Sequence, residues 1–128
     1  MPPANIQSDL LAPKIEPKSL MKCALGIRTT EIQAYMALLL EEGATVKEMA
    51  EKLGKSRPST QRLLQDLVSK NLAIREDNPI GRGGYEYTYK AVPPEKVKEF
   101  MEHTIDAWYH KVKSSLQDFP AQLHRRPK

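Results

Sequence analysis

Two neighbouring segments between residues 45 and 70 repeat their apolar positions at helical spacing. The first follows the i, i+3, i+4, i+7 pattern of a helix that buries one face. Thr45 and Glu48 have the spacing of a capping box, which marks the start of this helix, and Gly54 marks its end. The apolar positions of the first segment are Val46, Met49, Ala50 and Leu53.

The second segment predicts a helix over residues 56–70, so the two segments form a helix-turn-helix. Ser56 is a good N-cap residue, and Pro58 fits the first helical turn. At about 100° per residue, one side gathers Thr60, Leu63, Leu64 and Leu67, and we expect this side to face the core. The other side carries Pro58, Ser59, Gln61, Arg62, Gln65 and Ser69, with Arg57 on the flank near the N-terminus.

The polar side has the chemistry of a surface that reads DNA. Arginine and glutamine pair bidentately with the edges of guanine and adenine, and serines and a helix N-terminus contact phosphates. Between Lys52 and Gln65 the sequence has no carboxylate, so the positive charge of this window is not neutralised locally. The alternative is an ordinary solvated face, and this helix alone does not decide between the two. The basic residues of the window are Lys52, Lys55, Arg57 and Arg62.

Two more helices are predicted before this pair. Residues 18–25, after Pro17, have apolar positions on one side and favour a short helix. A stronger helix starts at Thr29 or Thr30 and ends at Gly43. Its connection to the next helix is very short, so three consecutive helices form a compact core. The apolar stripe of the stronger helix consists of Ile32, Tyr35, Met36, Leu39 and Leu40.

After Asn71 the apolar period changes from about 3.6 to about 2, which predicts a β-hairpin. Leu72 and Ile74 point to the same side of the outgoing strand. Residues 77–84, DNPIGRGG, have the composition of a turn or loop, and an alternating strand follows them. Three helices followed by such a hairpin form a winged helix.

The tip of this hairpin is basic, with Arg82 in its middle and no acidic residue between Pro79 and Tyr85. Arg82 either contacts the DNA backbone or minor groove, or is a solvated arginine on a mobile loop; the basic helix face nearby favours contact. The returning strand places Tyr85, Tyr87 and Tyr89 on one face. They lie in the body of the hairpin, so we interpret them as packing residues, with base stacking as the alternative.

The sequence predicts a long helix over residues 94–119, with Pro93 and Pro94 marking its start and Pro120 its end. A helix of about 25 residues is roughly 37 Å long, and one small domain cannot cover its apolar stripe. We therefore assign it to dimerisation, the alternative being that it folds back over its own domain. The stripe consists of Val97, Met101, Ile105, Trp108, Val112, Leu116 and Phe119, and Phe100 and Tyr109 widen it.

Several classes of function are disfavoured. His103, Asp106 and His110 lie near one face of the long helix at loose spacing, and we interpret them as solvated and not as a metal site. The chain has no glycine-rich phosphate loop, no nucleophile elbow and no paired catalytic carboxylates, so we predict no enzyme and no cofactor. Cys23 is the only cysteine, which excludes an internal disulfide and a cysteine-based zinc site.

The length of 128 residues fits one small domain with appendages. We assign residues 1–17 to a flexible arm, 18–93 to a winged helix-turn-helix domain, 94–119 to the dimerisation helix and 120–128 to a basic flexible tail. With 40% hydrophobic residues, the chain has no apolar run near the roughly 20 residues of a membrane helix, and its N-terminus lacks a signal peptide. We expect a cytoplasmic protein. The net charge of +4 is modest, so the placement of the charge matters more than its total.

The chain contains four stretches, LGIRTTEIQAYMALL, GATVKEMAEKLG, LVSKNLAIRE and YKAVPPEKV, within residues 25–100. Together they resemble the archaeal TrmB-like regulators, winged-helix transcription factors related in architecture to the MarR group. The resemblance implies that the helix matching 56–70 binds in the major groove, that the hairpin matching 72–92 forms the wing, and that dimers bind palindromic operators. These roles fall on Ser56, Arg57, Ser59, Gln61, Arg62, Gln65 and Arg82. The wing is longer and richer in glycine than the family's usual form.

We thus expect a mainly α fold with a small β-hairpin, and a homodimeric, sequence-specific transcriptional regulator that binds double-stranded DNA and acts by repression. The alternatives are a winged-helix adaptor for protein interactions and a non-specific architectural DNA binder. Sugar-sensing relatives carry a large C-terminal effector domain, and this chain stops at Lys128, so the resemblance implies no sugar effector. The predicted DNA-binding residues are Lys55, Ser56, Arg57, Pro58, Ser59, Gln61, Arg62, Gln65 and Arg82.

Overall fold

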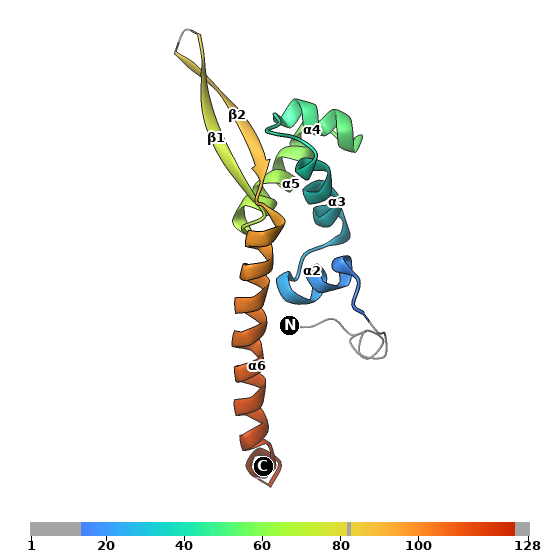
Figure 1. Ribbon diagram of the computed structural model, residues 1–128, viewed down its shortest axis with the longest axis vertical. Helices are drawn as coiled ribbons and strands as arrows, with labels where there is room; N and C mark the ends of the chain where they lie inside the picture. The colour runs from blue at the N-terminus through green and yellow to red at the C-terminus, as the bar shows by residue number, and fades with distance from the viewer. Residues whose placement is uncertain (1–13, 82, 125–128) are drawn as a thin grey trace.

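The computed structural model describes residues 14–81 and 83–124 (Figure 1). Helices α3, α4 and α5 form a compact group, a hairpin projects from one end of it, and a long helix projects from the other. This mainly α fold with a small β-hairpin confirms the predicted winged helix-turn-helix. The elements in order are α2 (Pro17–Leu25), α3 (Thr29–Leu39), α4 (Val46–Leu53), α5 (Arg57–Ser69), β1 (Ala73–Ile80), β2 (Gly84–Ala91) and α6 (Pro94–His124).

The caps predicted around α4 are present. The backbone N–H of Glu48 donates to Oγ1 of Thr45 at 3.1 Å, and the N–H of Thr45 donates to Oε1 of Glu48 at 2.9 Å. Gly54 ends the helix in the left-handed conformation, with φ of 64°. These two reciprocal bonds satisfy donors that the first turn of a helix leaves without partners, so local interactions define where this helix begins.

The core lies between α3, α4, α5 and the base of the hairpin. The predicted inner face of α5 is confirmed, because Thr60, Leu63, Leu64 and Leu67 are all buried. The predicted stripe of α3 is wrong in part: Leu38 is buried, whereas Met36 is 49% and Leu40 is 84% exposed. Leu39, also predicted in the stripe, is 37% exposed. The buried face of α3 runs through Glu31, Ile32, Ala34, Tyr35 and Leu38, which turns Met36 and Leu39 toward solvent, and Leu40 lies beyond the end of the helix.

The hairpin has longer strands and a shorter turn than the sequence suggested. β1 and β2 pair in antiparallel register from Ala73 with Ala91 to Ile80 with Gly84. The prediction of a loop over residues 77–84 is therefore wrong, since its first half is strand. Pro79 fits because each strand of a two-stranded sheet has one edge without a partner, where a missing N–H costs little.

The two faces of β1 also differ from the prediction. Leu72 is fully buried, but Ile74 is 49% exposed, so the two do not share a side. Asn71 has a positive φ of 64°, and β1 begins only at Ala73, which is buried. Leu72 belongs to the turn after α5, so it lies outside the strand to which the two-residue alternation applies.

Two contacts attach the hairpin to the helices. Ala44 and Tyr89 exchange backbone hydrogen bonds of 3.0 and 2.8 Å, which adds a short bridge from the segment before α4 to the edge of β2. The hydroxyl of Tyr35 on α3 donates to the carbonyl of Val92 at 2.7 Å. Tyr89 is 2% exposed. The base of the wing is therefore fixed against the helix-turn-helix.

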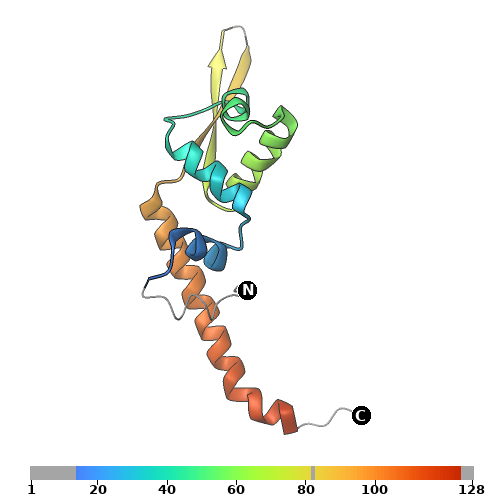
Figure 2. The same cartoon turned by 90° about the vertical axis from the view of Figure 1, so that its right-hand side faces the viewer.

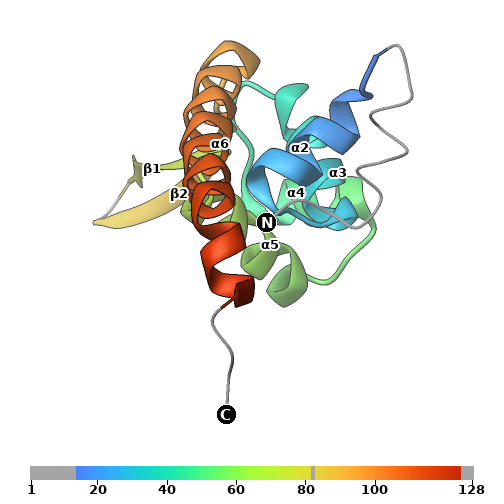
Figure 3. The same ribbon diagram turned by 90° about the horizontal axis from the view of Figure 1, so that it is seen from below.

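Helix α6 extends well past the rest of the domain (Figure 2). Figure 3 shows α2 and α3 on one side of α6 and the hairpin on the other, and α2 packs against α6. The predicted end at Phe119 is wrong, because the helix continues through Pro120 to His124. A proline inside a helix removes one hydrogen bond and strains the preceding turn, but it does not forbid the helix.

The predicted boundaries of the flexible segments change accordingly. Helix α2 already begins at Pro17, and residues 1–13 of the expected arm lie outside the described residues. Of the expected tail, residues 120–124 are helical and residues 125–128 lie outside the described part. Over the described stretches, no helix combines the length and the apolarity that spanning a membrane requires.

Candidate nucleic-acid interface

The outer face of α5, with the turn that precedes it, carries the residues that the sequence analysis assigned to DNA. The structure brings these residues onto one side of the helix, opposite its buried face. Arg82, also assigned to DNA, lies outside the described residues. The DNA-binding role of all these residues remains a prediction. The exposed residues are Lys55, Ser56, Arg57, Pro58, Ser59, Gln61, Arg62 and Gln65.

The turn between α4 and α5 sets the direction of this face. The N–H of Lys55 donates to the carbonyl of Ala50 at 3.1 Å, which closes the end of α4 after Gly54. The N–H of Ser59 donates to Oγ of Ser56 at 3.3 Å. The chain thus turns sharply and starts α5 with a side-chain cap, so the exposed N-terminal turn of α5 is held in one geometry.

Three basic side chains on this face have no acidic partner among the residues that the structure describes. Within residues 14–81 and 83–124, no ion pair involves Lys55, Arg57 or Arg62. Lys52 differs, because its Nζ lies 2.9 Å from Oε2 of Glu41. Of the four basic residues in the window without carboxylates, Lys52 is thus the one that already has an acidic partner.

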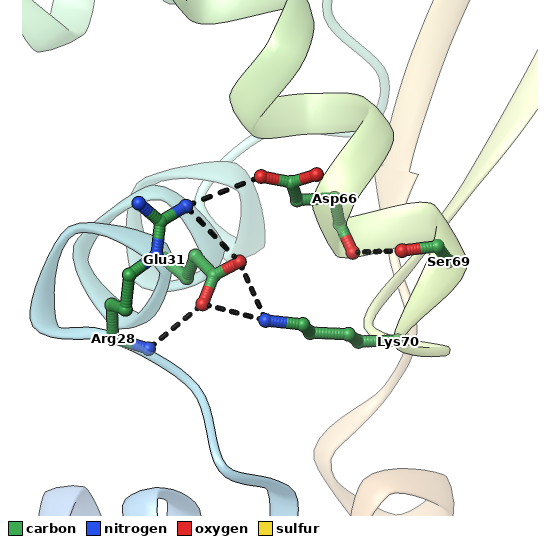
Figure 4. Close-up of polar contacts among 5 residues, drawn as sticks. All are labelled: Arg28, Glu31, Asp66, Ser69 and Lys70. Atoms are coloured by element: carbon green, nitrogen blue, oxygen red, sulfur yellow. Dashed lines mark hydrogen bonds and ion pairs between the residues drawn. The ribbon is translucent and has the colours of Figure 1, made fainter.

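A polar cluster that sequence reasoning missed joins α5 to the start of α3 (Figure 4). Glu31 is fully buried, and its carboxylate accepts hydrogen bonds from the backbone N–H of Arg28 at 2.7 Å and from Nζ of Lys70 at 2.9 and 3.0 Å. The Arg28 guanidinium lies 3.2 Å from Oδ2 of Asp66 and 3.5 Å from Oε2 of Glu31. The cluster therefore fixes the C-terminal end of α5 relative to the core.

Burial and hydrogen bonding act in opposite directions on the pKa of Glu31. Burial raises it, whereas the Arg28 backbone N–H, the ammonium of Lys70 and the guanidinium of Arg28 lower it, and the net result is a pKa below the ordinary value. The carboxylate is therefore charged at neutral pH. The available sequence signal was weak: Glu31 lies three residues after Arg28, the spacing of an N-cap and its N3 partner, but its bond to Lys70 spans 39 residues.

The wing presents a second feature that the sequence did not reveal. The guanidinium of Arg75 stacks over the ring of Tyr87, 4.4 Å from its centroid, and its Nε lies 3.5 Å from Oδ1 of Asp77. Of the three tyrosines on this face, Tyr89 is buried, whereas Tyr85 is 63% and Tyr87 is 47% exposed. The expected packing role is thus seen for Tyr89 in the core and for Tyr87 beneath an arginine.

Helix α6 keeps most of its apolar stripe uncovered. Val97 is buried against the core, and Met101 and Val112 are half-buried. His110 donates from Nδ1 to the carbonyl of Asp106 at 2.8 Å, and the described residues contain no group of acidic, histidine or cysteine side chains able to hold a metal ion. The uncovered apolar residues of α6 are Phe100, Ile105, Trp108, Tyr109, Leu116, Phe119 and Leu123.

Comparison with known proteins shows which family the chain belongs to. Residues 21–95 match the family described as "Sugar-specific transcriptional regulator TrmB". An uncharacterised protein of Methanocaldococcus jannaschii is 34% identical over 102 residues, which cover 80% of this chain and 84% of the relative. The match to the family spans α3, α4, α5 and the whole hairpin, and thus includes the outer face of α5.

Solved structures agree with the fold. A possible transcriptional regulator from Methanosarcina mazei aligns with a TM-score of 0.70 at 19% identity, over 79% of this chain and 86% of its own. The S. aureus MepR–DNA complex aligns with a TM-score of 0.52 at 18% identity, over 84% of this chain and 88% of that chain. At these identities the likeness shows the winged-helix fold. With the family match over residues 21–95, the chain belongs to the TrmB family of transcriptional regulators, as the sequence analysis predicted, and this is a family of regulators and not of enzymes.

Proposed function

We propose that this transcriptional regulator is a homodimer that reads a specific DNA sequence with α5 and represses transcription by occupying promoter DNA. The observation that carries the proposal is the outer face of α5. This face combines arginines without acidic partners among the described residues, glutamines, and a capped N-terminal turn on the exposed side of the helix. Such a face fits the major groove, where each bidentate pair with a base contributes about 1–3 kcal/mol of discrimination.

The residues have different roles in this proposal. Gln61, Arg62 and Gln65 project from the middle of the face and read base edges, whereas Ser56 and Ser59 at the N-terminal turn bind phosphates. Lys55, Arg57 and Pro58 border the same turn and complete the contact with the DNA. The distal part of the wing, residues 77–84 with Arg82, follows the backbone or the adjacent minor groove.

The exposed apolar stripe of helix α6 is the observation that supports a homodimer. Its apolar stripe begins in the core of its own domain, at Val97 and Met101, and continues along the same face beyond the domain. Helix α2 packs against α6, but the stripe from Ile105 to Phe119 stays largely exposed, so a second copy of α6 is the surface that matches this part. The sequence assigned Val97, Met101, Ile105, Trp108, Val112, Leu116 and Phe119 to this contact, but Val97 is buried in the core of its own domain and Met101 packs against that core. The proposed contact residues are therefore Ile105, Trp108, Val112, Leu116 and Phe119.

The experiment that tests this function is the selection of bound sequences from a random duplex pool at about 150 mM salt. A dimer with two recognition helices enriches an inverted repeat whose half-sites lie about ten base pairs apart, since successive major grooves on one side of the DNA are about 34 Å apart. Retention without an enriched sequence contradicts sequence reading and indicates an architectural binder. No retention at any salt concentration contradicts DNA binding and favours the adaptor.

A pair of variants links the selection to α5. Replacing Arg57 and Arg62 by alanine removes two positive charges from the outer face, and we expect loss of operator binding with the dimer intact. Replacing Lys18 and Lys22, which are exposed on α2, by alanine removes the same charge elsewhere and is the matched control. Equal losses of affinity in both variants show a general charge effect and contradict recognition through α5.

A further inference from the structure

A hollow with basic walls lies beside the outer face of α5, where α5 meets the start of α3. Arg28 and Thr30 line it from the α3 side, and Lys55, Ser59 and Arg62 line it from the α5 side. Three positive side chains from two different parts of the chain therefore surround one shallow space. A hollow of this composition fits a small anion with several oxygen acceptors.

Arg28 is available for such a ligand although it already has partners. Its side chain is 65% exposed, and its contacts at 3.2 Å to Asp66 and 3.5 Å to Glu31 both involve the same nitrogen, Nη2. Glu31 has donors besides this guanidinium, because it also accepts hydrogen bonds from the backbone N–H of Arg28 and from Lys70. A guanidinium has five N–H donors, so most donors of Arg28 remain for another acceptor.

We propose that this hollow binds a phosphate of the DNA backbone and that Arg28, from outside the helix-turn-helix, is a contact residue of the interface. The proposal rests on the proposed function and extends it to the flank of α5. When a recognition helix lies in a major groove, a phosphate backbone borders the groove beside the helix, which is where the hollow lies relative to Arg62 and Ser59.

The position of Asp66 gives Arg28 a second role in the proposed site. It lies one turn after Arg62 on α5 and also lines the hollow, so its carboxylate repels a phosphate that binds there. The guanidinium of Arg28 lies against this carboxylate and reduces the repulsion. Arg28 thus both attracts the phosphate and neutralises Asp66. Variants of Arg28 and Asp66 separate these two effects.

The experiment measures the affinity for the enriched duplex as a function of salt concentration in four proteins: wild type, Arg28→Ala, Asp66→Asn and the double variant. One lost phosphate contact lowers the slope of log K against log salt by about one, with equal effect on all operator sequences. We expect this loss for Arg28→Ala, and we expect Asp66→Asn to bind more tightly than wild type. Lys18→Ala, which removes one exposed charge on α2, is the matched control and keeps the wild-type slope.

The decisive comparison is made in the Asp66→Asn background. If Arg28 contacts phosphate, Arg28→Ala still lowers the slope by about one when Asp66 is already neutral. If Arg28 only holds or neutralises Asp66, its replacement has no effect in that background, and the phosphate site is overturned. Thermal unfolding of the same four proteins separates these effects from loss of the fold.

The failure of this proposal is distinguishable from failure of the proposed function. Suppose that the wild type binds the enriched duplex and that replacing Arg57 and Arg62 abolishes this binding. If the Arg28→Ala variant then has the same salt slope as the wild type, the result contradicts the phosphate site alone. A wild type that binds no duplex contradicts both.

Discussion

The Nζ of Lys70 lies 2.9 Å from Oε2 of Glu31, and this contact joins the end of α5 to the first turn of α3 (Figure 4). The carboxylate of Glu31 is fully buried, whereas the side chain of Lys70 is 35% exposed. Because α5 carries the outer face proposed to read DNA, an ion pair at its end fixes the direction of the reading helix. The stability of the fold and the geometry of the proposed interface therefore depend on the same buried charge.

Replacing Glu31 by glutamine should destabilise the protein by about 1–3 kcal/mol, the cost of removing a charged partner from a buried hydrogen-bonded group. The neutral amide keeps the size of the side chain and one acceptor oxygen, which can still accept from the Arg28 N–H. The NH2 group that replaces Oε2 cannot accept the bond from Lys70, and the charge that faces Lys70 and Arg28 is lost. Urea unfolding of both proteins measures the difference. Glu41→Gln, which breaks the more exposed pair with Lys52, is the control, and we expect less than about 1 kcal/mol. Equal losses in the two variants contradict a special role for Glu31.

The same residue predicts a dependence of stability on pH. The pKa of Glu31 is lowered in the folded protein, although burial opposes this, because backbone and side-chain donors bind its charged form. A lowered carboxyl pKa gives stability that is complete above the unfolded pKa of about 4.3 and is lost as the pH falls through the folded value. The stability difference between wild type and Glu31→Gln should therefore shrink from neutral pH to pH of about 3. A difference that is constant over this range contradicts a stabilising role for the charge on Glu31.

Replacing Tyr35 by phenylalanine tests the attachment of the wing. The variant loses the 2.7 Å hydrogen bond to the carbonyl of Val92 and should be less stable by about 0.5–1.5 kcal/mol. Hydrogen exchange of the Val92 and Tyr89 amides should become faster, because the base of the hairpin opens more easily. Burial and the nearby Glu95 raise the pKa of Tyr35, so its phenol should ionise at higher pH than an exposed tyrosine. Unchanged exchange at both amides contradicts the role of this bond in holding the wing.

The helix-turn-helix was predictable because its signals are local. Thr45, Glu48, Gly54 and Ser56 mark their helix ends through bonds that span a few residues, and helical spacing alone separates the buried from the exposed side of α5. The hairpin was predictable only in kind. Its turn composition spreads over DNPIGRGG, but the pairing of Pro79 with Tyr85 depends on the register of two strands and places half of that segment in β1.

The polar cluster and the hollow beside α5 were not predictable because they depend on tertiary contacts. Glu31 and Lys70 are 39 residues apart, and Arg28 and Asp66 are 38 residues apart. A glutamate in the first turn of a helix is ordinary in sequence, and nothing local indicates that it is buried. Arg28 was absent from the predicted interface for the same reason, since the packing of α3 against α5 places it beside Arg62 and Asp66.

Trp108 provides a direct test of the dimer through α6. It is the only tryptophan in the chain, is 36% exposed, and lies in the apolar stripe of α6. If two copies pair through this stripe, raising the protein concentration through the dissociation constant of the dimer buries the indole. The fluorescence maximum should then shift to shorter wavelength, in step with the mass measured by sedimentation equilibrium.

Leu116→Asp is the matched variant, because Leu116 is 61% exposed in the single chain and lies eight residues after Trp108 in the same stripe. A charge there should leave the stability of the monomer within about 0.5 kcal/mol, as for most exposed positions, but it should not be tolerated inside an apolar contact. We therefore expect the variant to keep its long-wavelength emission and the monomer mass at every concentration. A variant that still dimerises with unchanged affinity places the dimer contact on another surface, and a wild type that stays monomeric contradicts the homodimer itself.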